Sequence, residues 1–178
     1  ANDCTIAAGG KINAKGRGYS ANQGPGKPIN ASYTGASHGG RGGSYYNYGI
    51  TGPTYGSVTS PTNCGSGDTA VAGGGAVILT VGGATTIDGE IDADGAGAGT
   101  GNYAGAGGSI YITTGTFGGS GAIAADSGTF SHASTGGSGG GRIAVVLTGG
   151  SSFGSVAMTA APHKKGKYWL ASAGTIFT

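Results

Sequence analysis

Charged residues are scarce in this chain of 178 residues, because Asp, Glu, Lys and Arg make up only 9% of it, against about 25% in an average domain. The chain has one Met, one Trp, two cysteines and five prolines. So few charges exclude a helical protein with a solvated surface of Lys and Glu. Collagen is excluded because prolines are few and the glycines do not recur at every third residue.

The net charge and the longest apolar run exclude two further classes of protein. A formal charge of +2 carried by nine Lys and Arg residues gives no basic surface for nucleic acid. Residues 76–81 form the longest apolar run, far below the ~20 residues of a membrane span. We therefore expect no nucleic-acid partner and no membrane span. A start at Ala1 without Met is typical of a processed, secreted chain.

Glycine is what the chain has in abundance, with 44 residues, whereas an average chain contains about 7% glycine. Hydrophobic residues make up 37% of the sequence and fall in short patterned runs. This combination favours a β-rich domain with glycine-rich connections over a low-complexity chain. At this length we expect a single domain, residues 1–178, with a thin core.

Two short patterns recur along the chain. The first is a pair of small residues followed by an apolar run, and it returns every 33 residues at 74–79, 107–112, 140–145 and 173–178. The second, a glycine followed by alternating small, apolar and polar residues, lies at 10–15, 89–94, 121–126 and 154–159. Alternation of this kind predicts strands with one buried face. The glycine-rich stretches 95–106 and 127–139 occupy the same place in successive repeats, and we expect them to stack side by side.

The order of these patterns divides the chain into an insert and a repeat region. Residues 16–73 are rich in Gly, Pro and Tyr and predict a compact insert without regular structure. Residues 74–178 contain three 33-residue repeats and a terminal half-repeat. The predicted fold class is all-β, a glycine-rich repeat of β-solenoid type, with an antiparallel β-sandwich or jelly roll as the alternative.

The two cysteines, Cys4 and Cys64, are interpreted as a single disulfide that holds the insert to the first strand. Neither cysteine lies in a metal-binding or catalytic pattern. A disulfide implies an oxidising compartment. The alternative that we keep open is a pair of free thiols.

The repeats resemble a known kind of sequence. The strands GGxIxI and GxIxAxG, together with GGGRIAV at residues 139–145, are similar to the glycine-rich β-repeat regions of large secreted or surface proteins of bacteria. This resemblance implies an extracellular structural or adhesive role and transfers no catalytic residue. The chain is shorter than those proteins, which suggests that assembly supplies the missing length.

An acidic cluster is the strongest candidate for a metal site. It comprises Asp88, Glu90, Asp92 and Asp94, with Asp126 one repeat after Asp94. Crowded carboxylates repel one another unless they are solvated or bridged by a hard cation such as Ca²⁺. The alternative is a solvent-facing strand whose charges discourage edge pairing. A glycosidase or lyase would need a partner base and substrate-binding arginines that the pattern lacks, so we expect no enzyme.

The insert holds the candidate ligand-binding and modification sites. Its tyrosines predict either an aromatic platform for a sugar ring or the small core of the insert. Asn30 begins a glycosylation sequon, Asn30-Ala31-Ser32. The basic cluster at residues 164–167 is predicted to contact an acidic glycan or another subunit, or to form a solvated turn. The tyrosines in question are Tyr45, Tyr46, Tyr48 and Tyr55.

The function that this pattern favours is structural. Because the chain begins and ends within a repeat, residues 173–178 are predicted to add to the strand at residues 5–15, either of the same chain or of the next. Thr175, Ile176 and Phe177 are the assembly residues at one end, and Ile6 and Ile12 at the other. Pairing between chains would give a head-to-tail homopolymer, an extracellular fibre or matrix. The alternative is a monomeric adhesin or glycan-binding module that uses the tyrosines.

Overall fold

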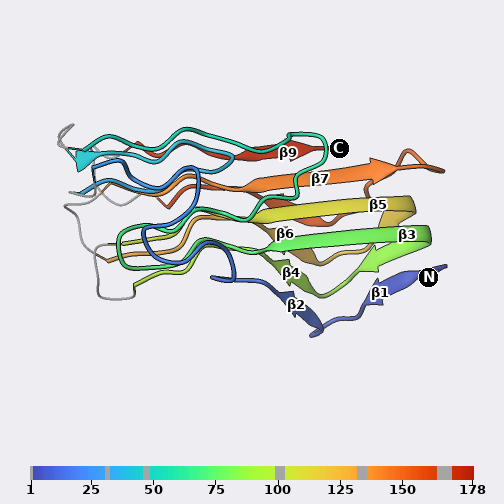
Figure 1. Cartoon of the computed structure of the whole chain (residues 1–178). Coiled ribbons are helices and arrows are strands. Elements are labelled where there is room, and N and C mark those ends of the chain that lie inside the picture. Colours follow the sequence, from blue (N-terminus) through green and yellow to red (C-terminus); the bar gives the residue numbers. More distant parts are fainter. Residues whose placement is uncertain (1, 31–32, 46–48, 99–102, 132–135, 164–169) are drawn as a thin grey trace.

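The strands form two stacks that occupy one half of the molecule, on the right in Figure 1. The computed structural model describes residues 2–30, 33–45, 49–98, 103–131, 136–163 and 170–178, and within them it has nine strands and no α-helix. The first sheet contains β1 (Cys4–Ile6), β3 (Ala76–Ile87), β5 (Ser109–Gly118), β7 (Arg142–Leu147) and β9 (Thr175–Phe177). The second contains β2 (Lys11–Asn13), β4 (Glu90–Asp92), β6 (Ala122–Ala124) and β8 (Ala157–Thr159).

The predicted fold class is wrong, both as a β-solenoid and as an antiparallel sandwich. The structure has two wholly parallel sheets, of five strands in the order β1-β3-β5-β7-β9 and of four in the order β2-β4-β6-β8. Sheets of this kind are typical of α/β proteins, where helices connect the strands. Here glycine-rich extended segments take the place of those helices. A repeat of short strands predicts where strands lie, but not what covers them.

The 33-residue repeat places equivalent residues in register across the first sheet. Val77, Ile110, Ile143 and Ile176 pair in succession along β3, β5, β7 and β9. In the second sheet Ile12, Ile91, Ile123 and Met158 pair in the same way. The strands predicted from both sequence patterns are therefore confirmed.

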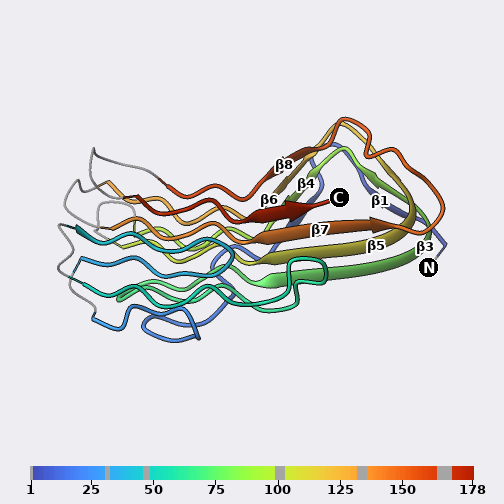
Figure 2. The same ribbon diagram turned by 90° about the horizontal axis from the view of Figure 1, so that it is seen from above.

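The core lies between the two sheets, which face each other and are joined by turns on one side (Figure 2). Every second side chain of the long strands points into this space, because successive residues of a strand face opposite ways. Ile110 and Ile143 of the first sheet and Ile91 and Ile123 of the second are fully buried there. Partly buried side chains surround this cluster: Ile12, Ala14, Leu79, Leu147, Phe153, Val156 and Met158.

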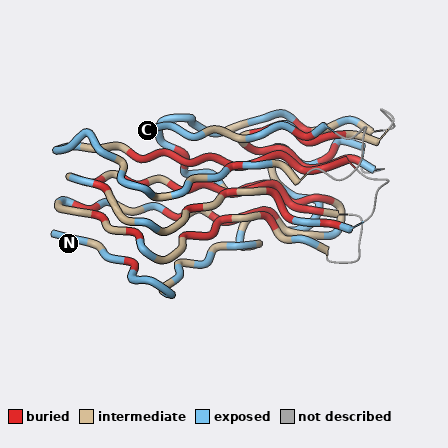
Figure 3. The backbone as a smooth tube through the Cα atoms, turned by 180° about the vertical axis from the view of Figure 1, so that it is seen from behind, coloured by how far each residue is buried: buried red, intermediate tan, exposed pale blue. Residues whose placement is uncertain are grey.

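Beyond the strands, the chain continues as closely packed extended segments, which we call the glycine layer: the described residues of 14–75, 93–108, 125–141 and 160–174. Buried stretches continue from the strands into this layer (Figure 3). Gly128 N donates to Gly105 O over 2.9 Å, so the expected stacking of residues 95–106 on residues 127–139 is confirmed where both are described. Two isolated antiparallel bridges, Thr34 with Ser44 and Gly97 with Ala104, also lie outside the sheets.

In the glycine layer, the backbone N–H groups of residues 105–108 donate hydrogen bonds to three different neighbouring segments. Gly105 N donates to Ala96 O, Ala106 N to Ser66 O in the insert, Gly107 N to Gly139 O in the next repeat, and Gly108 N to Ala93 O. Residues 105 and 108 thus donate to the same neighbouring segment, which is the three-residue period of a polyproline II helix. Such close packing requires glycine, because a Cβ on Gly108 would overlap the carbonyl oxygen of Gly75.

The insert is part of this layer rather than an appendage. Gly18 N donates to Gly73 O, Gly65 N to Gly74 O, and Gly40 N to Gly140 O, all over 2.8 Å. No strand longer than an isolated bridge occurs in the described residues of 16–73. The insert is therefore held to the repeats by backbone hydrogen bonds.

Candidate functional site

The two ends of the strand stack are open, and they differ. The lower edge is formed by the outer sides of β1, β2 and the first half of β3, and the upper edge by the outer sides of β8 and β9. Figure 1 shows β1 and β9 on opposite sides of the stack, with β3, β5 and β7 between them. Within one chain the first and last strands therefore do not meet. Any pairing between the two edges has to involve two chains.

At the lower edge, half of β3 is left without a neighbour. β1 pairs only with Thr85, Thr86 and Ile87, whereas β5 pairs with β3 from Ala76 onward. Residues 76–81 of β3 therefore have no strand on their outer side among the described residues. Ile78, in this open stretch, is 51% exposed.

At the upper edge, β9 covers only the first half of β7. Thr175, Ile176 and Phe177 pair with residues 142–144, and residues 145–147 extend beyond them. A groove of about 350 Å³ lies beside this uncovered half. Its lining is formed mainly by apolar side chains: Val145, Val146, Leu147, Phe153 and Phe177.

A second upper groove, of about 210 Å³, opens between the ends of β8 and β9. Met158 and Ile176 line it together with Ala160, Ala161 and Ala173. Ile176 points toward the core, because it pairs with the fully buried Ile143, yet it is 46% exposed. Its exposure arises because no strand lies above β9 in the described chain.

The predicted assembly residues occupy these edges. Ile12 is half-buried at the lower edge, and Ile176 and Phe177 are exposed at the upper edge. Ile6 is 7% exposed and belongs to the core, so it is less available than predicted. Within the chain β9 pairs with β7, so the predicted pairing of residues 173–178 with residues 5–15 of the same chain is not formed. β1 lies level with the second half of β3 and β9 with the first half. Pairing between chains stays a prediction.

The buried His38 and Arg142 and the half-buried Tyr55 form a polar cluster that connects the insert to the upper edge. The Arg142 guanidinium donates through Nε to Tyr55 O at 2.8 Å and through Nη1 to Thr175 Oγ1 at 3.0 Å. The rings of His38 and Tyr55 lie 4.7 Å apart. Arg142 thus holds the first residue of β9 in place on its inner side while the outer side stays open. Burial lowers the pKa of Arg142.

His38 is fully buried and neutral. Its Nδ1 lies 2.7 Å from Gly107 O, so this nitrogen carries the hydrogen and donates a hydrogen bond to the carbonyl. Nε2 has no hydrogen-bond partner within the described structure. Burial lowers the pKa of His38 to about 4, opposed by the Gly107 carbonyl and assisted by the nearby Arg142 charge. No local pattern in the sequence marks His38 or Arg142 as buried.

Of the tyrosines predicted to bind a sugar, Tyr55 does not form part of a surface platform. Its hydroxyl donates to Cys64 O at 2.7 Å and lies 2.8 Å from Ser66 Oγ, and burial raises its pKa. Tyr45 packs against Tyr33 with ring centroids 5.6 Å apart. Tyr46 and Tyr48 lie outside the described residues, as does the basic cluster at residues 164–167.

The predicted calcium ligands follow the second sheet and have partners from the protein itself. Lys11 Nζ lies 3.1 Å from Glu90 Oε1 and 2.8 Å from Asp92 Oδ2, and Lys15 Nζ lies 3.4 Å from Asp94 Oδ2. Burial tends to raise the pKa of Asp92, but the Lys11 ammonium and the Asp94 N–H hold it below its ordinary value.

The remaining carboxylates accept backbone N–H groups from later repeats. Asp94 accepts from Asp126 N at 2.8 Å, and Asp88 accepts from Ser120 N at 3.0 Å. Burial raises the pKa of Asp94, although the Asp126 N–H opposes this shift. Asp126 in turn accepts from Ala161 N at 2.6 Å. Within the described ranges no three His, Cys, Asp or Glu side chains gather in a metal-binding group, and calcium binding stays a prediction.

The predicted disulfide is not formed, because Cys4 and Cys64 are both free in the structure. Cys4 pairs with Thr85 near the end of β3, whereas Gly65, next to Cys64, donates to Gly74 just before β3 begins. The two positions are separated by roughly 30 Å along β3, and a disulfide needs Cα atoms within about 7 Å. Asn30, the predicted glycosylation site, is exposed, while residues 31–32 of its sequon lie outside the described residues.

Comparison of the chain with models of protein families, with curated proteins and with solved structures finds no match. The described residues include no helix with the length and apolar character needed to cross a membrane. The functional proposal therefore depends on the geometry of the two open edges.

Proposed function

We propose that this chain is a structural subunit of an extracellular fibre or matrix, and that it assembles head to tail by completing its own parallel sheets. The observation that supports this proposal is the match in register between the two open edges. β9 covers the first half of a strand position, and β1 covers the second half. When one copy is stacked on another, β9 of the first copy and β1 of the second lie one after the other in the same strand layer. They are level with residues 76–78 and 85–87 of β3, respectively.

The register across the proposed junction follows from the pairing within the chain. Ala76, Ser109, Arg142 and Thr175 occupy one position on successive strands, so β9 of one copy pairs with the first residues of β3 of the next. Three residue pairs result in the first sheet: Thr175 with Ala76, Ile176 with Val77, and Phe177 with Ile78. In the second sheet β8 pairs with β2 of the next copy: Ala157 with Lys11, Met158 with Ile12, and Thr159 with Asn13.

The two upper grooves lie where this pairing needs space. The groove lined by Met158 and Ile176 faces the half-buried Ile12 of the next copy. The groove beside residues 145–147 lies level with residues 79–81 of β3, in the space between β9 and the next copy's β1. Burial of apolar side chains stabilises this junction, and strand hydrogen bonds fix its register.

Stacking of this kind joins two different surfaces of the subunit and therefore continues without closing, which produces a filament. Each copy advances by the four strand spacings from β1 to β9, or about 19 Å at ~4.8 Å for each spacing. Electron micrographs of assembled protein are expected to show this axial repeat. The alternative of a monomeric glycan-binding module has less support, because Tyr55 is withdrawn from the surface.

A cysteine cross-link tests the proposed register. Phe177 and Ile78 both point away from the core and are exposed, and their Cα atoms are expected about 5 Å apart across the junction, within disulfide range. In a Cys4→Ser, Cys64→Ser background, Phe177→Cys with Ile78→Cys is expected to give a ladder of covalent oligomers on non-reducing gels.

The matched control keeps Phe177→Cys and moves the second cysteine to Thr86, eight residues farther along β3. At ~3.3 Å for each residue the second position lies about 26 Å from the first, so no ladder is expected. Equal ladders from both pairs, or no ladder from Phe177→Cys with Ile78→Cys in assembled protein, would disprove the register. A second variant, Ile176→Lys, is expected to stop assembly while the subunit stays folded, because Ile176 is already 46% exposed.

A further inference from the structure

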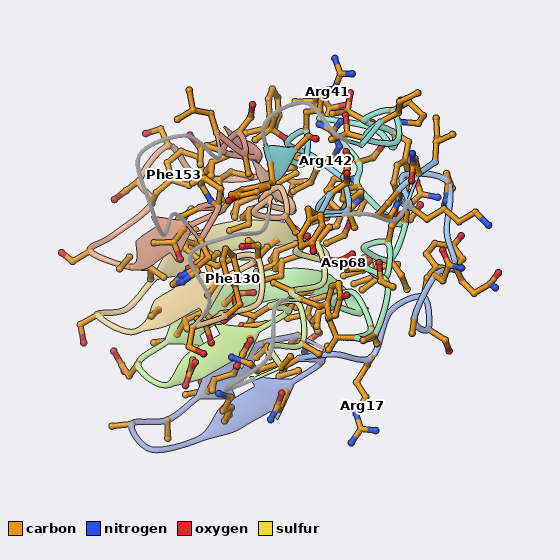
Figure 4. All side chains as sticks on the ribbon, turned by 90° about the vertical axis from the view of Figure 1, so that its left-hand side faces the viewer. Arg17, Arg41, Asp68, Phe130, Arg142 and Phe153 are labelled. Carbon is orange, nitrogen blue, oxygen red and sulfur yellow. The ribbon has the colours of Figure 1, made fainter. Side chains whose placement is uncertain are left out.

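The insert adds an apolar surface of its own at the upper edge. Two adjoining grooves, of about 520 and 510 Å³, share Arg41, Ile50 and Thr51 in their lining. Ile29, Ile50 and Leu170 line one or both of them and are 67%, 58% and 78% exposed. Figure 4 shows Arg41 at the end of the molecule opposite Arg17.

Hydrogen bonds relate Arg41 to a residue of the lower edge. Ser172 N donates to Arg41 O at 2.8 Å, and Gly73 N donates to Tyr19 O at 3.0 Å. Residue 172 follows residue 73 by three 33-residue repeats. Arg41 therefore contacts the terminal half-repeat in the same way as Tyr19 contacts the first repeat. Arg41 lies three strand spacings above Tyr19 in the stack.

We propose that Tyr19 of the next copy docks on Arg41 and the neighbouring Ile50, so that the insert forms a second contact between subunits. This inference rests on the proposed head-to-tail assembly. In that assembly each copy advances four strand spacings, and Tyr19 of the next copy lies one spacing, about 4.8 Å, beyond Arg41.

The side chains at both positions suit this contact. Tyr19 is 37% exposed, and one side of its ring lies against Gly24 of its own chain. Arg41 is exposed, and its Nε donates to Thr51 Oγ1 at 2.7 Å, which orients the planar guanidinium beside the groove. A guanidinium over a tyrosine ring forms a cation–π contact, and the ring covers part of the exposed surface of Ile50.

The critical concentration for assembly, measured by sedimentation, tests the contact. Tyr19→Ala and Arg41→Met are each expected to raise it about two- to fivefold, the range given by one exposed cation–π contact. Tyr19→Phe keeps the ring and is expected to leave the critical concentration unchanged. The double variant is expected to show no more effect than either single one.

A second cross-link separates this inference from the proposed function. Tyr19→Cys with Arg41→Cys, in the background without native cysteines, is expected to give covalent oligomers. If this pair fails while Phe177→Cys with Ile78→Cys succeeds, the insert contact is disproved and head-to-tail assembly stands. If neither pair forms oligomers, the proposed assembly itself is wrong. Additive effects of Tyr19→Ala and Arg41→Met would likewise overturn the contact.

Discussion

Two buried titratable groups, His38 and Asp68, are expected to affect stability with opposite dependence on pH. Burial lowers the pKa of His38 to about 4, and burial raises the pKa of Asp68 to about 7 despite the N–H groups of Thr69 and Ala104. The exposed fractions of these residues are 0% and 1%. Both groups are therefore uncharged in the folded chain between pH 4 and 7. In the unfolded chain the histidine is protonated below pH 6.5 and the aspartate is ionised above pH 3.8.

The signs follow from comparing the folded and unfolded chains. Below pH 6.5 the unfolded chain protonates its histidine while folded His38 does not, so the His38 contribution is full above pH 6.5 and is lost as pH falls toward 4. Above pH 3.8 the unfolded chain ionises its aspartate while folded Asp68 keeps its proton. The Asp68 contribution is therefore full below pH 3.8 and is lost as pH rises toward 7. Each pKa unit corresponds to about 1.4 kcal/mol, which gives about 3 kcal/mol for His38 and about 4 kcal/mol for Asp68.

Urea unfolding of dilute, unassembled protein between pH 4 and 7.5 measures these contributions. Relative to the unsubstituted chain, Asp68→Asn is expected to gain up to about 4 kcal/mol as pH rises from 4 to 7. His38→Gln is expected to lose up to about 3 kcal/mol from pH 4 to 6.5. The double variant combines both trends and is the internal control. If the difference between Asp68→Asn and the unsubstituted chain does not change with pH, Asp68 is not protonated in the folded state and the reasoning fails.

Two further predictions concern the glycine layer and the second sheet. Gly108→Ala is expected to destabilise the fold by about 3 kcal/mol, because its Cβ overlaps the Gly75 carbonyl, whereas Gly118→Ala, with no atom within 4 Å, is expected to change stability by less than about 0.5 kcal/mol. Equal effects in thermal unfolding would contradict the close packing of the layer. Lys11→Met leaves the buried Asp92 carboxylate without its ammonium partner and is expected to cost about 1–2 kcal/mol. A stability unchanged at pH 7 would show that Asp94 N–H alone satisfies this carboxylate.

The candidate site was partly predictable from the sequence. The recurrence of the pattern of residues 107–112 at residues 173–178 predicts a further strand that contains Ile176 and Phe177, and β9 confirms this strand. The predicted pairing of residues 173–178 with residues 5–15 of the same chain is not formed, because β1 and β9 lie at opposite edges of the first sheet and β1 lies level with the second half of β3. That offset depends on how far β3 extends.

Tertiary contacts also decided which polar residues are buried. Tyr55, one of the tyrosines predicted to form either a sugar platform or the core of the insert, is half-buried because its hydroxyl contacts Cys64 O and Ser66 Oγ across the insert. His38 and Arg142 come from segments more than a hundred residues apart, and no local pattern relates them. The separation of Cys4 and Cys64 could not be predicted either, because a count of cysteines does not show that these residues lie at opposite ends of β3.

The sequence by itself determined where the strands lie, because alternation of small, apolar and polar residues is a local property that requires one buried face. It also determined the 33-residue step that places Val77, Ile110, Ile143 and Ile176 in register. Only the tertiary structure decided that all strand pairs in the sheets are parallel and that the glycine segments form a hydrogen-bonded layer. The reason is that a glycine backbone carries no side-chain pattern, so its N–H groups acquire their partners from whichever segments the folded strands bring within reach.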